Sequence, residues 1–210
     1  MFRRLMGRLA PSTQAPTGRV EGLVVGLGNP GREYENTRHN AGFLAIDRIA
    51  KSCGADLSRL KFQSQIGDAM IGGHRVLLMK PSTFMNRSGI AVKEASDFYK
   101  IPPERILVIF DDIALPVGRM RIRRSGSDGG QRGMQNILYL MGVDTLPRIR
   151  LGIGAKPHPD YDLKDWVLSR FSDTEWQHLG PILDTLPDAV TLILEGRIDE
   201  AMGKYNGFTA

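Results

Sequence analysis

Short apolar runs alternate with segments of helical periodicity along most of this chain. The run from Gly22 to Leu27 predicts a buried strand that leads into a glycine-rich turn, and residues 106–110 form a continuous apolar run typical of a central strand. Between these two, apolar side chains recur at helical spacing over residues 43–53, and Gly54 is placed to end that helix. The order strand, loop, helix, strand indicates an α/β fold.

The rest of the chain continues this alternation. The further elements predicted, in chain order, are a hairpin of residues 69–71 and 76–79, a helix over 88–99, a strand over 119–124, a helix over 133–141, a strand over 148–154, and helical segments within 174–205 interrupted by Pro181, Pro187 and Gly196. No compositional break separates these elements after residue 19. We therefore predict one α/β domain over residues 20–210, with a twisted, mixed and mostly parallel sheet flanked by helices.

Residues 1–19 differ in composition from the rest of the chain. They hold four of the 28 basic residues and no acidic one, so the remainder has 24 basic side chains against 23 acidic ones. The net charge of +5 and the pI near 9.5 therefore come largely from this segment, which we expect to be a disordered basic tail. An organellar presequence and an upstream start are open alternatives.

Composition beyond the tail predicts a soluble protein of a reducing compartment. No apolar run approaches the roughly 20 residues that cross a bilayer, and the single cysteine, Cys53, has no internal disulfide partner. We expect a cytoplasmic protein, or an organellar one if the tail is a presequence. Nothing in the pattern calls for an obligate protein partner, so a monomer is expected.

A basic cluster is the local feature that favours a polyanionic partner. Residues 113–127 contain no acid and four arginines within six positions, Arg119, Arg121, Arg123 and Arg124. A solvated strand face is the plainer interpretation of such a run. The cluster by itself leaves both interpretations open.

The glycine turn matches the dinucleotide-binding motif in its glycine spacing but not in the residues that follow. Gly26, Gly28 and Gly31 spell G-x-G-x-x-G, but in dinucleotide-binding folds those glycines open a helix directly and an acidic residue follows about 20 residues later. Here the helix is predicted to begin near Ala41, and Pro30 removes a backbone N–H that a phosphate would use. We therefore interpret the glycines as a tight turn that presents polar side chains at the end of the first strand.

One of the four histidines, His39, lies in that polar loop. Asp111 and Asp112 end the central strand, so a carboxylate is expected at the same edge of the sheet. For one of the two aspartates, capping of the following turn is an alternative role. A carboxylate that accepts Nδ1–H leaves the histidine Nε2 free as a general base. A satisfied structural histidine is the alternative. With no G-x-S-x-G motif, the pair favours water activation at a bond such as an ester.

Two asparagines, Asn29 and Asn86, lie beside predicted strand ends. Their carboxamides offer donors and an acceptor without charge, which suits a peptide backbone or an oxyanion, and either is equally explained as a turn residue. No HExxH motif and no Cys and His cluster predicts a metal site.

With these residues assembled, the chain resembles the bacterial-type peptidyl-tRNA hydrolase family. The matching stretches are GLGNPGREYENTRHNAGF, KPSTFMNRSG, the DD-I-A-L-P-VG run from Asp111, and RIRLGIG from Arg148. The resemblance implies a monomeric α/β enzyme without a cofactor. Such an enzyme hydrolyses the ester that links a peptide to the 3′ ribose of tRNA, and so recycles tRNA from abandoned translation.

The resemblance also implies roles for single residues. His39 would activate water and Asp111 would hold it in working form. Asn29 would separate N-blocked from free aminoacyl-tRNA, and Asn86 would bind the peptidyl end.

Further positions are implied for contacts with the tRNA. Tyr34 and Phe84 would line the cleft for the tRNA terminus, where an aromatic face stacks on a base or ribose. Arg121, Arg123 and Arg148 would form a clamp for the 5′-phosphate, which positions the substrate without reading its sequence.

One departure from the family pattern concerns the residues after the Gly-Gly turn. The family usually has His-Asn there, and this chain has Gln131-Arg132. The usual Asn contacts the tRNA end and helps to position the catalytic water, and we do not carry that role over to Arg132. Two competing functions are an RNA-binding scaffold without catalysis, as in an organellar branch recruited to intron splicing, and a nicotinamide oxidoreductase.

Overall fold

A seven-stranded sheet with the order β2-β3-β4-β1-β5-β7-β6 forms the centre of the fold. The structure is a computed structural model and describes residues 17–209. Its strands are β1 (Gly22–Gly26), β2 (Arg59–Lys61), β3 (Ser64–Ile71), β4 (His74–Pro81), β5 (Ile106–Asp112), β6 (Met120–Arg123) and β7 (Arg148–Gly152). The pairs β4-β1, β1-β5 and β5-β7 are parallel, and the pairs at the two sides are antiparallel.

The predicted mixed sheet of a single α/β domain is confirmed, but the expectation that the sheet is mostly parallel is wrong. Parallel pairing is confined to the centre and accounts for three of the six strand pairs. Strand β3 starts earlier than predicted, and β2 was not predicted. All three residues of β2 are exposed, so no alternation of apolar and polar positions marks it.

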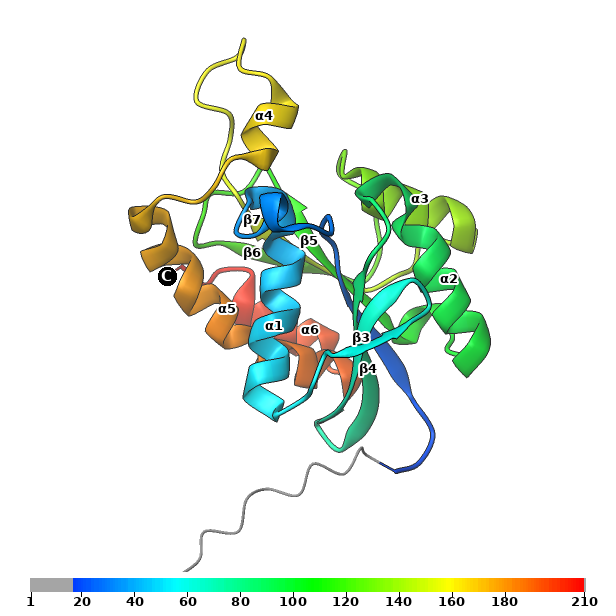
Figure 1. Cartoon of the computed structure of the whole chain (residues 1–210). Helices are drawn as coiled ribbons and strands as arrows, with labels where there is room; N and C mark the ends of the chain where they lie inside the picture. The colour runs from blue at the N-terminus through cyan, green and yellow to red at the C-terminus, as the bar shows by residue number, and fades with distance from the viewer. Residues whose placement is uncertain (1–16, 210) are drawn as a thin grey trace, which may run out of the picture.

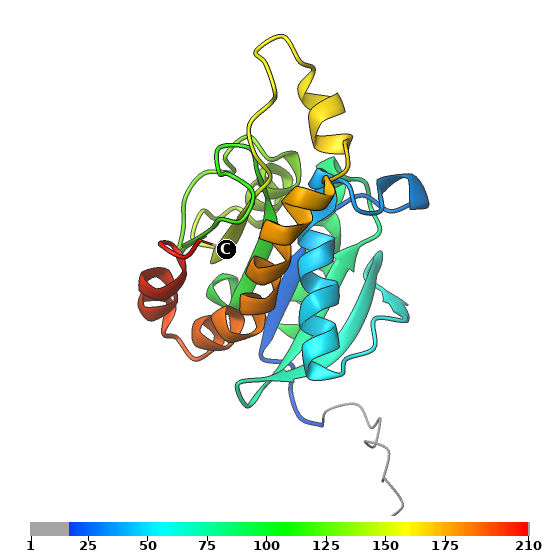
Figure 2. The same cartoon turned by 90° about the vertical axis from the view of Figure 1, so that its left-hand side faces the viewer.

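Helices cover both faces of this sheet (Figures 1 and 2). Their bounds are α1 (Ala41–Cys53), α2 (Ser88–Tyr99), α3 (Arg132–Met141), α4 (Leu163–Leu168), α5 (Asp173–Leu194) and α6 (Ile198–Tyr205), and the 3₁₀ helices are η1 (Arg32–Tyr34), η2 (Arg38–Asn40), η3 (Met85–Arg87) and η4 (Pro103–Arg105). Helices α1, α5 and α6 pack on one face and α2 and α3 on the other, each over its own apolar cluster. Helix α4 lies on an arm that projects beyond the sheet (Figure 1).

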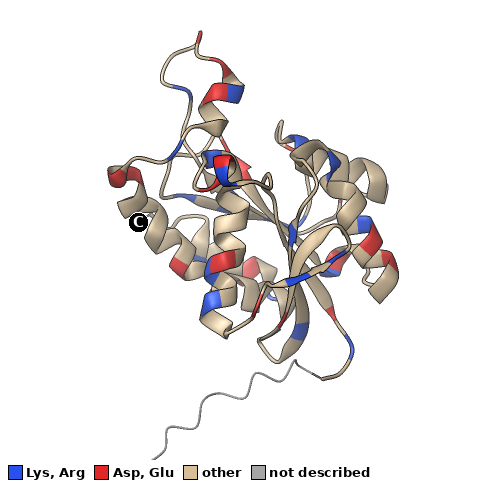
Figure 3. Cartoon of the chain, in the orientation of Figure 1, with Lys and Arg blue, Asp and Glu red and all other residues tan. Residues whose placement is uncertain are grey.

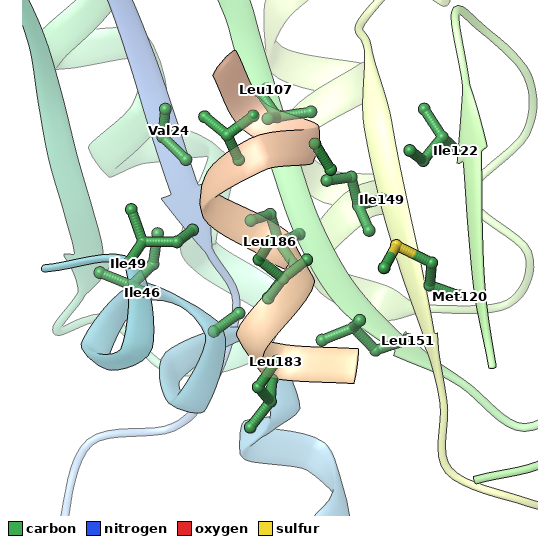
Figure 4. Packing of buried hydrophobic residues seen from close by; sticks show 14 of the residues in the cluster. Val24, Ile46, Ile49, Leu107, Met120, Ile122, Ile149, Leu151, Leu183 and Leu186 are labelled. Atoms are coloured by element: carbon green, nitrogen blue, oxygen red, sulfur yellow. The ribbon is translucent and has the colours of Figure 1, made fainter. Parts of the chain in front are cut away.

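Helix α5 runs unbroken through Pro181 and Pro187, so the breaks predicted there are wrong, whereas the break predicted at Gly196 is confirmed between α5 and α6. Leu183 and Leu186 lie between α1 and the strands β5, β7 and β6 (Figure 4). A proline inside a helix costs about 3 kcal/mol, and each fully buried large aliphatic side chain contributes about 1.5–3 kcal/mol. The helix buries eight apolar residues, so packing outweighs the two prolines.

The glycine turn brings the start of α1 against the ends of β1 and β5. A Cβ on Gly26 would lie 2.1 Å from the carbonyl oxygen of Gly42, and one on Gly42 would lie 2.4 Å from the carbonyl oxygen of Ile109. Only glycines permit this approach. Because η2 immediately precedes α1, the close contact fixes η2 at the carboxyl end of β5, where open α/β sheets carry their sites.

The tail predicted over residues 1–19 falls mostly outside the described residues, which start at residue 17. Residues 17–19 are exposed. Within residues 17–209, no helix combines the length and the apolar character that a membrane span requires.

Candidate active site

His39 and Asp111 meet at the carboxyl end of the central strands, as their sequence positions predicted. Nδ1 of His39 lies 2.8 Å from Oδ2 of Asp111. The histidine side chain is 15% exposed and the aspartate side chain 4%, so the pair is shielded while the ring still reaches solvent. With Nδ1–H donated to the carboxylate, the Nε2 lone pair is available to accept a proton.

The surroundings of His39 raise the pKa of its imidazole. Burial is the largest influence and favours the neutral ring, but the charge of Asp111 and the hydrogen bond to it together outweigh burial. The charge of Arg132, at the start of α3, opposes protonation. The raised pKa makes His39 a stronger base than an ordinary histidine. The His39 ring must be neutral before it can accept a proton from water.

Asn29 is held in place by two neighbouring loops. Its Oδ1 accepts from the backbone N of Met85 at 2.9 Å, which ties the glycine turn to η3. Its backbone N donates to Oδ1 of Asn40 at 2.8 Å, and Nδ2 of Asn40 donates back to the Asn29 carbonyl at 3.0 Å. Asn40 was not singled out from the sequence, although its place directly after His39 was a usable signal.

The predicted aromatic and amide positions lie on two loops, Tyr34 in η1 and Phe84 and Asn86 at η3. Phe84 is 59% exposed, and Asn86 is exposed in η3 beside the buried Met85. Tyr34 ends η1 and is half-buried. A hollow of about 530 Å³ lies next to Asn29 and Asn40 and continues along the loop from Pro30 to Asn36 and the end of β4, and neither His39 nor Asp111 lines it.

Gln131 also belongs to the centre. Its Nε2 donates to Oδ1 of Asp111 at 3.1 Å and lies 3.0 Å from Sδ of Met85. Its Oε1 accepts from the backbone N of Met134 at 2.7 Å, so the side chain caps α3. Sequence reasoning noted Gln131 only as a departure from the family pattern.

Arg38 holds the loop that carries His39. Its side chain is 5% exposed, and its guanidinium pairs with Glu175 and lies over the ring of Trp166, 3.8 Å from the ring centroid. Its Nε donates to Oγ of Ser169 at 2.9 Å, and its Nη1 donates to the carbonyl of Ile153 at 3.2 Å. The residue was missed because its partners are more than 100 positions away in the sequence.

Asp112 has the capping role that the sequence left open for one of the two aspartates. Its Oδ1 accepts from the backbone N of Ala114 at 2.9 Å. Its Oδ2 lies 2.9 Å from Nε of Arg150. Asp112 therefore shapes the turn after β5, and Asp111 alone contacts His39.

The basic strand differs from expectation at Arg148. Arg121 and Arg123 are exposed on β6, as predicted, but Arg148 is 1% exposed, and its guanidinium donates to the carbonyls of Leu146, Gly126, Ser127 and Asp144. Burial, and then the neighbouring charge of Arg150, lower the pKa of Arg148. Arg148 therefore holds loops together, with its guanidinium occupied by backbone carbonyls.

Arg150 is the arginine of β7 that does reach the surface. It pairs directly with Arg121 across β6 and β7, so the two side chains share a face of the sheet. Elsewhere basic and acidic residues are interspersed over the helices and strands (Figure 3). The sequence pattern could have suggested Arg150, since it lies two residues after Arg148 on the same strand and therefore on the same face of the sheet.

Known proteins are similar to this chain over most of their length. The family model described as Peptidyl-tRNA hydrolase matches residues 23–210. The peptidyl-tRNA hydrolase of Caldanaerobacter subterraneus subsp. tengcongensis is 49% identical over 185 residues, 88% of this chain and 99% of that protein. That of Clostridium novyi is 48% identical over 188 residues, 90% of this chain and 99% of that protein.

A solved structure shows the same fold. The crystal structure of peptidyl-tRNA hydrolase from Acinetobacter baumannii is 34% identical, with a TM-score of 0.85, and the match covers 92% of this chain and 99% of that one. Together with the family model and the relatives, this likeness decides the assignment. The chain belongs to the peptidyl-tRNA hydrolase family and is an enzyme of that family.

Proposed function

We propose that the chain hydrolyses the ester bond between the peptide and the 3′ ribose of peptidyl-tRNA, with His39 as the general base. The observation that carries the proposal is the 2.8 Å contact between His39 Nδ1 and Asp111 Oδ2, which leaves Nε2 free. Family membership supports the substrate. The bacterial relatives support a place in translation, where the enzyme would recycle tRNA in the cytoplasm.

The proposed reaction needs water, the ester and the His39 ring. The water oxygen bonds to the ester carbonyl carbon while a water proton passes to Nε2 of His39. The tetrahedral intermediate then collapses, the bond from carbon to the ribose oxygen breaks, and the imidazolium returns a proton to that oxygen. Asp111 stabilises the transient imidazolium through Nδ1–H. General base catalysis of this kind contributes about 10²–10⁴ in rate.

Asn29 is proposed to distinguish blocked from free amino ends. Because its Oδ1 is used by the backbone N of Met85, the group it can turn to a substrate is the Nδ2 donor. A donor suits the carbonyl of a peptide bond. It is disfavoured beside a free α-ammonium, which is positively charged and offers no acceptor.

The loops around Asn29 are proposed to hold the rest of the acyl end and the tRNA terminus. Asn86 would bind the peptidyl end, and the hollow beside Asn29 offers space for further peptide residues. The exposed ring of Phe84 would stack on a terminal base or ribose, with Tyr34 on the other loop.

The tRNA phosphate clamp is proposed to consist of Arg121 and Arg123 on β6, with Arg150 in place of the buried Arg148. The exposure of the two β6 arginines and the pairing of Arg150 with Arg121 support this assignment. Phosphate contacts position the substrate without reading its sequence, which suits an enzyme that accepts many tRNAs.

The test is the release of N-acetyl-aminoacyl groups from charged tRNA by the wild type and by His39→Ala. Unblocked aminoacyl-tRNA is the substrate control. Selective hydrolysis of the blocked substrate that is lost in the variant is the expected result. Tight, salt-sensitive tRNA binding without hydrolysis would instead support the RNA-binding scaffold as the function. A saturable fluorescence change with NADH would support the oxidoreductase.

A further inference from the structure

Asp111 is held from both sides. Oδ2 faces Nδ1 of His39 at 2.8 Å, and Oδ1 accepts from Nε2 of Gln131 at 3.1 Å. Gln131 is 5% exposed, so the contact is shielded from water. A hydrogen bond to a buried carboxylate restricts rotation of that carboxylate and counts for more than one at the surface.

The direction of the Gln131 amide follows from its other partner. Oε1 accepts from the backbone N of Met134 at 2.7 Å, and a backbone N–H can only donate. Turning the amide over would place Nε2–H₂ against that N–H and Oε1 against the Asp111 carboxylate, with both contacts repulsive. The fold therefore aims the amide donor of Gln131 at Asp111.

We propose that Gln131 is a positioning residue for ester hydrolysis. Its amide holds the Asp111 carboxylate turned toward His39 and adds no charge to the pair of His39 and Asp111. The inference rests on the proposed role of His39 and Asp111. Because Gln131 also caps α3, it joins the first turn of that helix to the catalytic pair.

Neutrality of Gln131 matters because few charges face His39. Asp111 reaches it from β5 and Arg132 acts on it from the start of α3, while the Arg38 side chain is paired with Glu175 instead. A second carboxylate at position 131 would add negative charge next to Asp111 and favour the protonated ring. The protonated ring cannot accept a proton from water, so less of the enzyme would be active at neutral pH.

Two substitutions separate the contact to Asp111 from the cap on α3. In Gln131→Ser the side chain still caps the helix, since serine is a preferred N-cap, but it is too short to contact Asp111. In Gln131→Glu the side chain keeps its length and, when ionised, replaces the donor by a like charge. Thermal unfolding of both variants shows whether α3 remains folded.

We expect Gln131→Ser to lower kcat about tenfold, the effect of one charge-assisted hydrogen bond, with KM changed less than about twofold. Its melting temperature should stay within about 2 °C of the wild type. We expect Gln131→Glu to lower kcat further at neutral pH. The ring titration of His39, followed by NMR without substrate and assigned with His39→Ala, should move to higher pH in this variant.

Two results would overturn the inference. One is a Gln131→Ser enzyme with wild-type kcat. The other is a Gln131→Glu enzyme in which the His39 ring titrates as in the wild type. A wild-type enzyme without hydrolysis would count against the proposed function, while the NMR titration still decides whether Gln131 acts on His39 through Asp111.

Discussion

The guanidinium of Arg38 holds the carboxylate of Glu175 by two parallel hydrogen bonds, from Nη1 to Oε1 at 2.8 Å and from Nη2 to Oε2 at 2.9 Å. The two residues are 137 positions apart. The backbone N of Arg38 also donates to the carbonyl of Ser169 at 2.9 Å, ahead of α5. The position of His39, the next residue, therefore depends on contacts with the last third of the chain.

Glu175→Gln should lower kcat several-fold and leave KM nearly unchanged. Loss of the charge weakens the bidentate pair and loosens the loop of His39, without touching a group proposed to contact the substrate. The measurement is steady-state hydrolysis of N-acetyl-aminoacyl-tRNA. Asp68→Asn is the matched control, since Asp68 accepts two hydrogen bonds from Arg75 on the hairpin β3-β4, at 3.0 and 2.7 Å. If both variants lowered kcat equally, general destabilisation would explain the loss.

His39→Ala should reduce kcat by about 10²–10⁴, the range of general base catalysis, and leave tRNA affinity largely intact. The reason is that His39 is proposed to act on water and not on the tRNA phosphates. Hydrolysis is compared with tRNA binding measured by filter retention or fluorescence anisotropy. A parallel loss of binding and turnover would contradict the general base assignment.

Hydrolysis should increase with pH through the raised pKa of His39, because the neutral ring is the active form. Stability should respond in the opposite sense. A group whose pKa is higher in the folded state than in the unfolded state adds to the free energy of unfolding at pH below its unfolded-state pKa. This contribution is lost as pH rises through its folded-state pKa. The pH profile of kcat is compared with urea unfolding across the same window. In His39→Ala this part of the pH dependence of stability should disappear.

Arg121→Ala combined with Arg123→Ala should raise KM and reduce the salt dependence of tRNA binding, by roughly one unit of slope per lost phosphate contact. Arg148→Met provides the contrast. It removes the donors that hold the backbone carbonyls of three loop residues, so it should lower the melting temperature while the salt dependence stays that of the wild type. Unchanged salt dependence in the double variant would exclude the clamp on β6.

Gly42→Ala should destabilise the fold by about 1–3 kcal/mol or more and impair hydrolysis, since its Cβ would press on the backbone of Leu27 and Ile109. Gly203→Ala is the control. Apart from its chain neighbours and the backbone of its own helix, no atom lies within 4 Å of a Cβ placed at Gly203 in α6, so alanine there should stabilise by about 0.5–1 kcal/mol. Urea unfolding of both variants measures the difference, and equal effects would show that the close approach at Gly42 is unimportant.

Much of the fold was readable because periodicity and turn chemistry are local. The runs that became β1, β5 and β7, the helix that ends at Gly54, and the position of His39 and Asp111 at strand ends all followed from neighbouring residues. Helix α5 could not be predicted in this way, because its two prolines locally indicate a break. The burial that offsets the prolines comes from packing against α1 and the sheet.

The sequence by itself determined the α/β class, the family, and which residue types stand at the ends of the central strands, since these depend on spacing along the chain. Tertiary structure decided which of two adjacent aspartates faces His39 and that Arg148 turns inward while Arg150 reaches the surface. It also decided that Gln131 contacts Asp111 and that Arg38 anchors the loop of His39. Those outcomes depend on how segments far apart in the sequence pack together and on which hydrogen-bond partners their buried polar groups find there. A local sequence pattern does not contain that information.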